Sequence, residues 1–356
     1  MASQTSLEFD QKMIQRCLAL AQGGLGHVAP NPMVGAVVTC NGEIIGEGFH
    51  HAYGGPHAEV FAIDSVRDKA LLAHSSLYVS LEPCCHFGKT PPCTELILKH
   101  RISRVVVGCS DIFKEVAGKG IAQLKEAGVE VTCGVLEAEC LEFNRRFFTF
   151  HGSARPYLIL KWAQTEDGFV AREDRSSKWI SCEASRQLVH QWRSQESAIM
   201  VGTTTALLDD PQLTVRHVAG PDPLRIVFDR RLRLPRHLHL FDGAVKTLIF
   251  SERRGEKGSE NLVFEQIEFG EHTLENALAA LQRRKILSCI VEGGAALLNS
   301  FIVGNLWDEA RVFICPQKFG AGVQSPAITQ QNFQTSKVGV DELRVYRNKL
   351  HPKNGS

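Results

Sequence analysis

Apolar positions along the first 150 residues alternate between helical spacing and the short runs typical of strands. Residues 10–22 carry apolar side chains every three or four positions, which predicts an amphipathic helix that ends at Gly23-Gly24. Two apolar segments flank Asn41-Gly42, a strong signal for a two-residue hairpin turn. After the first helix, the predicted elements are strands 34–40 and 43–49, helix 57–68, strand 76–81, helix 93–100, strand 104–109, helix 118–127, strand 129–133 and helix 137–150. This order predicts an α/β fold in which helices sandwich a sheet.

The rest of the chain alternates in the same way and predicts a second α/β unit with its own core. Its predicted strands are 157–162, 198–201, 224–228, 245–250, 288–291 and 310–314, and its predicted helices are 183–194, 274–285 and 295–303. Between the two units, residues 151–156 have the composition of a linker. We therefore predict two domains, 1–150 and 151–356, and a length of 356 residues suits that number.

Composition and charge narrow the class of protein. Hydrophobic residues make up 44% of the chain, and the formal net charge of +1 argues against an extended nucleic-acid surface. No stretch approaches the ~20 apolar residues of a membrane span, and the N-terminus carries Glu8 and Asp10 instead of a secretory signal. The 11 cysteines are scattered, which favours reduced thiols over disulfides. We expect a cytoplasmic protein with neither a nucleic-acid nor a membrane partner.

The strongest chemical signal is a set of possible metal ligands in the first half. His57 stands two residues before Glu59, and Cys84 and Cys93 follow after a predicted helix and strand. One imidazole and two thiolates suit zinc, and a catalytic zinc keeps its fourth position for water. In zinc-dependent base deaminases, the glutamate of the His-x-Glu motif is not a ligand but transfers protons. The pattern therefore predicts a zinc deaminase with Glu59 as the catalytic residue.

The spacing of these residues adds a geometric condition and an alternative. The two cysteines stand nine residues apart, whereas the usual deaminase signature is P-C-x-x-C, so a loop is inserted between the ligands. Residues i and i+2 do not share a helix face, so His57 and Glu59 reach one ion only if it lies off the helix N-terminus. The alternative is a structural zinc with Cys85 or His86 as a fourth ligand.

Candidate nucleotide-binding residues in the second half follow predicted strands. The segment 291–295 ends a strand in Gly293-Gly294 before a helix, and such a turn lets backbone amides approach phosphate. No G-x-G-x-x-G follows a predicted strand, so the standard dinucleotide fingerprint is absent. Arg230 and Arg231 either meet a 2′-phosphate, which favours NADPH over NADH, or form a solvated basic turn. In the first half, Asn31 is either a turn residue or an amide that binds a pyrimidine edge.

In combination, these motifs resemble the bifunctional riboflavin-biosynthesis family, in which a pyrimidine deaminase precedes a reductase. The likeness covers residues 8–350. In the first half it rests on residues 30–35, 56–59, 81–84 and 86–93, with the nine-residue cysteine spacing. In the second half it rests on Leu160-Lys161, Asp167-Gly168, Trp179-Ile180, Arg193, Thr205, and residues 209–216, 225–227 and 291–294.

The resemblance implies a cytidine-deaminase-like α/β/α sandwich followed by an α/β domain similar to dihydrofolate reductase. It also implies one Zn²⁺ per chain, NADPH and a homo-oligomer. His57, Cys84 and Cys93 match the zinc ligands, and Glu59 matches the proton shuttle. The positions that match nucleotide contacts are Ala163, Trp179, Thr205, Asp209, Arg230, Gly294, Ala295, Ala296, Leu297, Leu298, Asn299 and Ser300. The expected substrate contacts are Asn31, Lys161, Ser177, Arg193, Leu213, Arg216 and Glu292.

The implied activity has two steps on a phosphoribosyl-pyrimidine. The first is zinc-dependent hydrolytic deamination, and the second is NADPH-dependent reduction of the ribosyl to the ribityl side chain. We expect the inserted loop 85–92, with His86, Lys89 and Thr90, to hold the phosphoribosyl group, unless it is only a longer surface loop. Departures from the family pattern at 112–115, at Thr165-Glu166 and at Cys85 fall on the pocket rims.

Two alternatives belong to other classes. One is a zinc deaminase acting on nucleosides or tRNA, with an accessory C-terminal domain. The other is a non-enzymatic protein in which the zinc is architectural. The presence of Glu59, which a structural site does not need, favours an enzyme.

Overall fold

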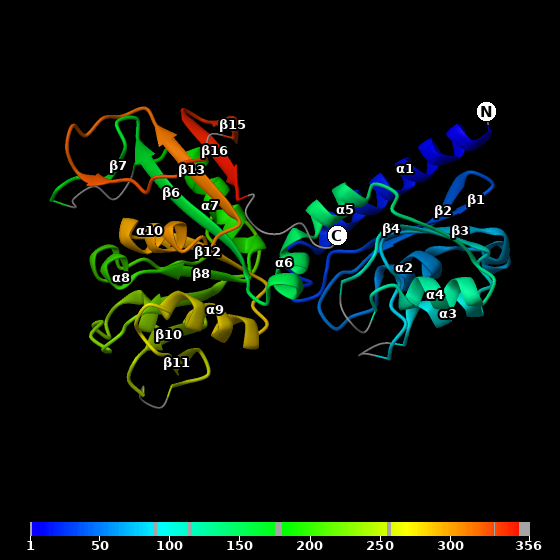
Figure 1. The fold of residues 1–356 in the computed structure, drawn as a ribbon, viewed down its shortest axis with the longest axis horizontal. Helices are drawn as coiled ribbons and strands as arrows, with labels where there is room; N and C mark the ends of the chain where they lie inside the picture. The colour runs from blue at the N-terminus through cyan, green and yellow to red at the C-terminus, as the bar shows by residue number, and fades with distance from the viewer. Residues whose placement is uncertain are drawn as a thin grey trace. The chain divides into compact units, whose positions relative to one another are not determined.

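The computed structural model describes residues 2–87, 91–112, 116–174, 180–254, 258–330 and 332–348. The chain divides into two compact units, Met1–Ser153 and Ala154–Ser356, and each has its own sheet (Figure 1). The division lies three residues beyond the predicted boundary. The expectation of a linker over 151–156 is wrong for its first half, because helix α6 (Arg145–Ser153) continues through these residues.

The first unit contains a five-stranded sheet in the order β2-β1-β3-β4-β5. Strand β1 is antiparallel to β2 and β3, whereas β3, β4 and β5 are parallel. The strands are β1 (Gly35–Cys40), β2 (Glu43–Phe49), β3 (Ser76–Leu81), β4 (Arg104–Cys109) and β5 (Glu130–Cys133). The other helices are α1 (Ala2–Ala21), η1 (Gln22–Gly24), α2 (Ala58–Ser65), η2 (Lys69–His74), α3 (Cys93–Lys99), α4 (Lys119–Glu126) and α5 (Glu137–Phe143).

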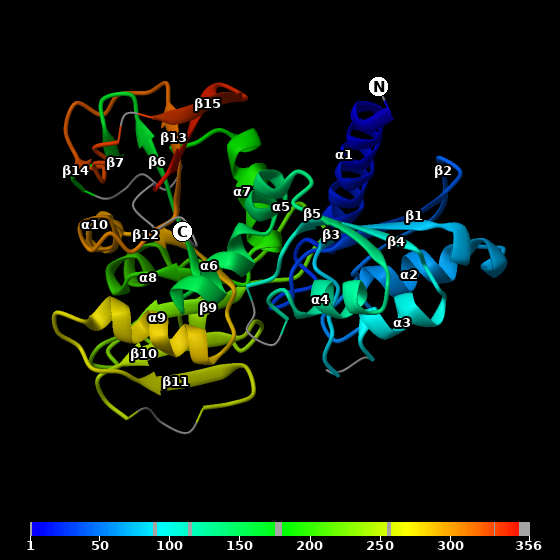
Figure 2. The same ribbon diagram turned by 45° about the vertical axis from the view of Figure 1, so that its right-hand side comes forward.

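Helices cover both faces of this sheet, as predicted. Helices α2, α3 and α4 pack on one face, and α1 and α5 contribute to the core on the other (Figure 2). Adjacent residues of β1 serve the two cores: Val38 faces the first and Val37 the second. Both faces of the sheet are covered, so every position of β1 is buried, as is every position of β3 after its first.

One helix predicted as continuous is two. The segment 137–150 is divided at Asn144 between α5 and α6. The Asn144 side chain accepts a hydrogen bond from Met33 N and donates one to Met33 O, both at 2.9 Å. This contact fixes the segment that carries Asn31 and Pro32 against the helical pair.

The second unit contains a nine-stranded sheet in the order β11-β10-β9-β8-β12-β6-β13-β16-β15. The pairs from β11 to β13 are parallel, and β16 is antiparallel to both its neighbours. The strands are β6 (Tyr157–Thr165), β7 (Phe169–Ala171), β8 (Ala198–Val201), β9 (Leu224–Phe228), β10 (Thr247–Ser251), β11 (Leu262–Gln266), β12 (Ser288–Gly293), β13 (Glu309–Cys315), β14 (Val323–Gln324), β15 (Phe333–Val338) and β16 (Asp341–Arg347). The helices are α7 (Glu183–Gln195), α8 (Thr203–Asp209), η3 (His239–Phe241), α9 (Thr273–Arg283) and α10 (Ala295–Val303).

Successive side chains along the central strands β6 and β12 point to opposite faces of this sheet. Leu160 and Val291 pack in the core formed with α9 and α10. Ile159 and Ile290 pack on the other side, against Trp192 of α7. Side chains that continue this second row, further along β6 and β12, therefore point to the same side as α7.

Strands β7, β11, β14, β15 and β16 and helix α8 were not predicted from the sequence. Strand β15 is an edge strand that is exposed at five of its six positions, so its apolar pattern is weak. Helix α8 has only seven residues and begins with three threonines. Within the described residues, no helix has the length and apolar character needed to cross a bilayer.

Candidate functional site

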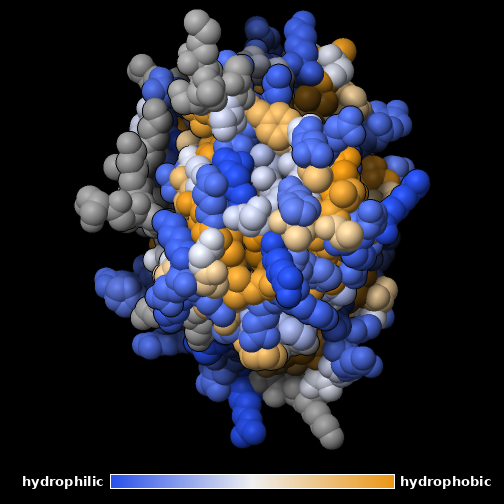
Figure 3. Space-filling model, turned by 90° about the vertical axis from the view of Figure 1, so that its right-hand side faces the viewer, coloured by the Kyte–Doolittle hydropathy of each residue, from blue (hydrophilic) through white to orange (hydrophobic). Residues whose placement is uncertain are grey.

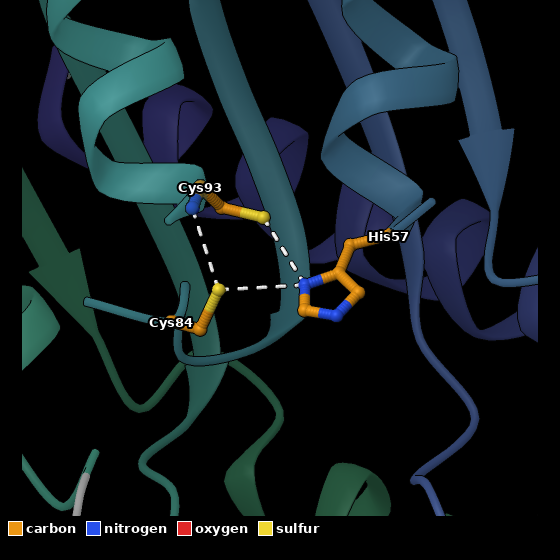
Figure 4. Close-up of side chains that lie close together, drawn as sticks. All are labelled: His57, Cys84 and Cys93. Carbon is orange, nitrogen blue, oxygen red and sulfur yellow. Dashed lines mark hydrogen bonds between the residues drawn. The ribbon is translucent and has the colours of Figure 1, made fainter. Parts of the chain in front are cut away.

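Three side chains of the first unit converge where two helices begin. His57 is the residue before α2, Cys93 is the first residue of α3, and Cys84 lies beyond the end of β3. His57 Nδ1 lies 3.4 Å from Cys84 Sγ and 3.3 Å from Cys93 Sγ (Figure 4). The backbone N–H of Cys93 donates to Cys84 Sγ at 3.3 Å. The expectation that His57 lies at a helix N-terminus is confirmed.

These separations suit a tetrahedral zinc ion. With Zn–S bonds of about 2.3 Å and Zn–N bonds of about 2.0 Å, sulfur and nitrogen ligands stand about 3.5 Å apart. Hydrogen bonds from the Cys93 thiol and from His57 lower the pKa of Cys84, and the thiolate is the form that binds metal. Within the described ranges, His57, Cys84 and Cys93 form the one group of possible ligands close enough to share an ion, and neither Cys85 nor His86 belongs to it.

Glu59 is buried beside this group. It is the second residue of α2 and only 3% exposed. Its carboxylate has a hydrogen bond with the Cys93 thiol, and burial raises the pKa of Glu59 while the charge of His57 opposes that rise. A carboxyl group with a raised pKa, next to possible ligands but outside the ligand group, is suited to accept and return a proton.

Asn31 closes a turn through its backbone N–H, which donates to Val28 O at 2.8 Å, while its side chain contacts a histidine. Its Nδ2 lies 3.0 Å from His50 Nε2, and His50 Nδ1 lies 2.9 Å from the Pro56 carbonyl oxygen. Burial lowers the pKa of His50, so this imidazole is neutral at pH 7. A neutral ring whose Nδ1–H donates to Pro56 accepts from Asn31 through Nε2. His50 thus connects Asn31 to the residue preceding His57.

Glu82 ties a distant segment to the strand end that carries Cys84. Its buried carboxylate accepts hydrogen bonds from the backbone N–H groups of Asp111 and Gly118, at 3.1 and 2.9 Å, through Oε2. Through Oε1 it accepts from Gly120 and Ile121, at 3.0 and 3.2 Å. Residues 81–84 carry part of the family resemblance, but no role for Glu82 could be predicted from the sequence.

The predicted phosphoribosyl loop is only partly described. Lys89 and Thr90 lie outside the described residues, as do 113–115 of the segment that departs from the family pattern. His86 is described and partly buried. The hypothesis that this loop holds the phosphoribosyl group therefore stays a prediction.

In the second unit, Lys161, Arg193 and Glu292 come together on the α7 side of the sheet. Arg193 Nε and Nη2 donate to the two oxygens of Glu292 at 3.0 and 2.7 Å, and Lys161 Nζ lies 3.9 Å from the same carboxylate. Burial alone would raise the pKa of Glu292, but the charges of Arg193 and Lys161 outweigh it and lower that pKa to about 2. Burial also lowers the pKa of Lys161, which makes its ammonium a better proton donor.

Leu213 and Arg216 belong to a segment fixed against this cluster. Arg193 Nη1 donates to Thr214 O at 3.1 Å, and Arg216 N donates to His190 Nδ1 at 3.1 Å. Leu213 is buried with a φ of 55°, a left-handed conformation that a non-glycine residue adopts only where its surroundings impose it. Three predicted substrate contacts, Arg193, Leu213 and Arg216, are thus brought into one region. Ser177 lies outside the described residues.

A cavity of about 760 Å³ opens beside the glycine turn after β12. A Cβ on Gly293 would lie 2.8 Å from Thr205 Cγ2, and Gly294 has a φ of 76°, so both positions suit glycine. Six of the predicted nucleotide contacts line the cavity: Thr205, Gly294, Ala296, Leu297, Asn299 and Ser300. Its size and its position at a helix start fit the phosphate-bearing part of a nicotinamide nucleotide.

The other predicted nucleotide contacts that the structure describes do not line this cavity. Leu298 points into the core and is 2% exposed. Ala163 packs near α7, Ala295 starts α10 and Asp209 ends α8. Trp179 lies outside the described residues. The Arg230 guanidinium stands over the ring of Phe269, which lines the cavity. Phe269 could not be predicted from the sequence, because it lies 39 residues from Arg230 and forms no local pattern with it.

Comparison with known proteins covers both units. The family model for the RibD C-terminal domain matches residues 156–351, and the model for the cytidine and deoxycytidylate deaminase zinc-binding region matches residues 7–109. The riboflavin biosynthesis protein RibD of Aquifex aeolicus is 41% identical over 321 residues, which are 89% of each chain. The chain belongs to the RibD family.

Other RibD proteins support the same assignment. RibD of Escherichia coli is 33% identical and is matched over 88% of this chain and 89% of its own. The crystal structure of a deaminase/reductase from Thermotoga maritima superimposes with a TM-score of 0.87 at 35% identity, covering 96% of this chain and 99% of that one. Acinetobacter baumannii RibD also gives a TM-score of 0.87, at 34% identity, with coverage of 96% and 100%.

As a RibD protein, the chain is a bifunctional enzyme of riboflavin biosynthesis: a zinc-dependent deaminase joined to an NADPH-dependent reductase. The predicted fold classes of both halves are confirmed. Because RibD relatives match both units, the second is not an accessory to a nucleoside or tRNA deaminase, and that alternative is wrong.

Proposed function

We propose that the first unit hydrolyses the 2-amino group of 2,5-diamino-6-(5-phosphoribosylamino)pyrimidin-4(3H)-one and that the second reduces the ribosyl chain of the product. The Thermotoga maritima relative is described as a diaminohydroxyphosphoribosylaminopyrimidine deaminase/5-amino-6-(5-phosphoribosylamino)uracil reductase, which supports this substrate. The observation that carries the deaminase half is the convergence of His57, Cys84 and Cys93 beside buried Glu59.

In the deaminase, we assign the zinc to His57 Nδ1 and the sulfurs of Cys84 and Cys93. Zinc bound there lowers the pKa of a bound water toward about 7. Glu59 would accept one proton from the attacking water and deliver it to a ring nitrogen. It would then take the second proton from the added hydroxyl and give it to the departing amine, so water is consumed and ammonia released. Asn31, oriented by His50, holds the pyrimidine edge.

In the reductase, the glycine turn and α10 hold NADPH, which supplies the hydride for C1 of the opened ribose. Lys161 donates a proton to the nitrogen or oxygen on which charge develops, and Glu292 keeps this ammonium in place. Arg216 and the remaining donors of Arg193 bind the substrate phosphate, since guanidinium matches phosphate oxygens. Asp209 is a further polar contact to the nucleotide, and Arg230 meets its 2′-phosphate.

We also propose that the chain acts as a homo-oligomer in a reducing cytoplasm. All 11 cysteines are free thiols, and Cys84 and Cys93 must stay reduced to bind zinc. Figure 3 shows apolar side chains gathered among hydrophilic ones on one face, the kind of surface that subunit contacts cover. Light scattering on the purified chain tests the oligomer, and a purely monomeric mass contradicts it.

The decisive experiment follows ammonia release and NADPH consumption separately. Glu59→Gln keeps the size of the side chain but cannot accept the proton, so we expect ammonia release to fall at least about 100-fold. Reduction of substrate that is already deaminated should stay within about twofold of the wild type. Glu95→Gln, at an exposed position in the first turn of α3, is the matched control. Equal loss of both activities in a folded Glu59→Gln protein would contradict the division of labour.

A further inference from the structure

The order of strands in the second unit indicates which way a bound dinucleotide would run along the sheet edge. At the carboxyl edge of the sheet, the strands follow one another as β6, β12, β8, β9 and β10. Lys161 and Glu292 stand on β6 and β12, so the reacting nicotinamide belongs at this end. In open α/β sheets, ligands lie across the carboxyl ends of the strands. The adenosine half of the dinucleotide must then extend past β8 toward β9 and β10.

Two phenylalanine side chains line the cavity on the side of β9 and β10. Phe228, the last residue of β9, and Phe269, which follows β11, both line it, and their ring centroids are 6.2 Å apart at 85°. Phe228 is 7% exposed, whereas Phe269 is only partly buried. Phe269 is therefore the ring with surface available to a ligand.

The charged side chains around Phe269 indicate where the phosphate and the base of the nucleotide can lie. The Arg230 guanidinium carbon lies 5.8 Å from the Phe269 ring centroid. Arg230 Nε donates a hydrogen bond to Glu252 Oε2 at 2.5 Å, which fixes the guanidinium. On the side of α9, the cavity is lined by Glu271 and Glu275, whose charges repel phosphate. A neutral planar group fits beside Phe269 and the two glutamates, and a phosphate fits on the side of Arg230.

We propose that Phe269 is the adenine-binding residue of the reductase, with the base against its ring and the 2′-phosphate directed to Arg230. This inference rests on the proposed function, because it assumes that the cavity holds NADPH. Adenine presents a flat π-face to an aromatic side chain, and such contacts depend on the ring more than on hydrogen bonding. Phe269 then contributes to cofactor affinity without touching the reacting atoms.

The test uses calorimetric binding of NADPH and of its two halves to the zinc-loaded, full-length protein. Adenosine 2′,5′-bisphosphate carries only the adenosine half, and reduced nicotinamide mononucleotide carries only the other. We expect Phe269→Ala to weaken NADPH and adenosine 2′,5′-bisphosphate about tenfold, leaving the mononucleotide within about twofold. Phe269→Tyr, which retains the ring, should bind all three like the wild type.

A matched control exists in the same unit. Phe333 also has an arginine over its ring, Arg344 at 5.1 Å, but lies on β15 at the far edge of the sheet. Phe333→Ala should bind all three ligands normally. Unchanged binding of adenosine 2′,5′-bisphosphate to Phe269→Ala, or equal weakening of the mononucleotide, would overturn the assignment. Failure of the wild type to consume NADPH with the deaminated substrate would instead contradict the proposed function.

Discussion

Glu292 is a buried carboxylate of the second unit that stays ionised because two cationic side chains lie beside it. Its side chain is 7% exposed, so its ionisation depends on the two hydrogen bonds from Arg193 and the nearby Lys161. Since its pKa falls from 4.5 to about 2, the folded state gains about 3 kcal/mol at neutral pH. For a lowered carboxyl pKa, this stabilisation is complete above about pH 4.5 and is lost as the pH falls toward 2.

Arg193→Met removes the charge that lowers the pKa of Glu292 and keeps only an unbranched apolar side chain of about the length of the arginine stem. We expect the free energy of unfolding at pH 7 to fall by about 3 kcal/mol, because Glu292 then loses its bidentate partner inside the protein. Urea unfolding between pH 2 and 7 should also show a weaker acid dependence than the wild type. The control is Arg284→Met, which breaks the exposed pair with Glu265 and should cost less than about 1 kcal/mol. Equal losses for the two variants would contradict this account.

At the scale of elements, two helix starts and one strand end build the zinc site. Helix α2 begins directly after His57, α3 begins at Cys93, and β3 ends shortly before Cys84. Glu82 accepts four backbone hydrogen bonds, one from Asp111 after β4 and three from the start of α4, and so links this strand end to both. The contact is close, since a Cβ on Gly120 would lie 2.1 Å from the Pro83 carbonyl oxygen.

Glu82→Gln tests whether this link positions Cys84. An amide has one acceptor oxygen, and its NH₂ group would face backbone N–H groups, so we expect a loss on the order of 3 kcal/mol of stability. Competition with a chromophoric chelator should show at least about tenfold weaker zinc binding, while NADPH binding stays normal. Glu126→Gln, exposed near the end of α4, is the control. Unaltered zinc affinity in a destabilised Glu82→Gln protein would give Glu82 a purely structural role.

Elements with buried faces could be predicted from sequence, and those held by distant partners could not. Strand β3 has the residues predicted for it because its side chains are buried on both faces. The break at Asn144 was missed because its partner, Met33, lies 111 residues away. The His57, Cys84 and Cys93 set was accessible because zinc chemistry restricts the residue types. The hydrogen bonds to Glu82 could not be predicted from the sequence, because their donors are backbone N–H groups, which nearly every residue carries.

At the scale of the whole molecule, each unit has its own cores and its own candidate site. Residues of the first unit make up two of the hydrophobic clusters, and residues of the second make up the others. The metal ligands all belong to the first unit, and the nucleotide cavity belongs wholly to the second. Loss of the metal should therefore remain a local event.

Removal of zinc by a chelator should separate the two activities. We expect ammonia release to fall to background, because the attacking water then keeps its ordinary pKa near 15.7. NADPH-dependent reduction of the deaminated substrate should stay within about twofold, since no ligand lies in the second unit. In scanning calorimetry, only the unfolding of the first unit should move to lower temperature, because metal binding stabilises the unit that provides the ligands. Added zinc should restore both ammonia release and that transition, whereas a parallel loss of reduction would mean that the metal supports the second unit as well.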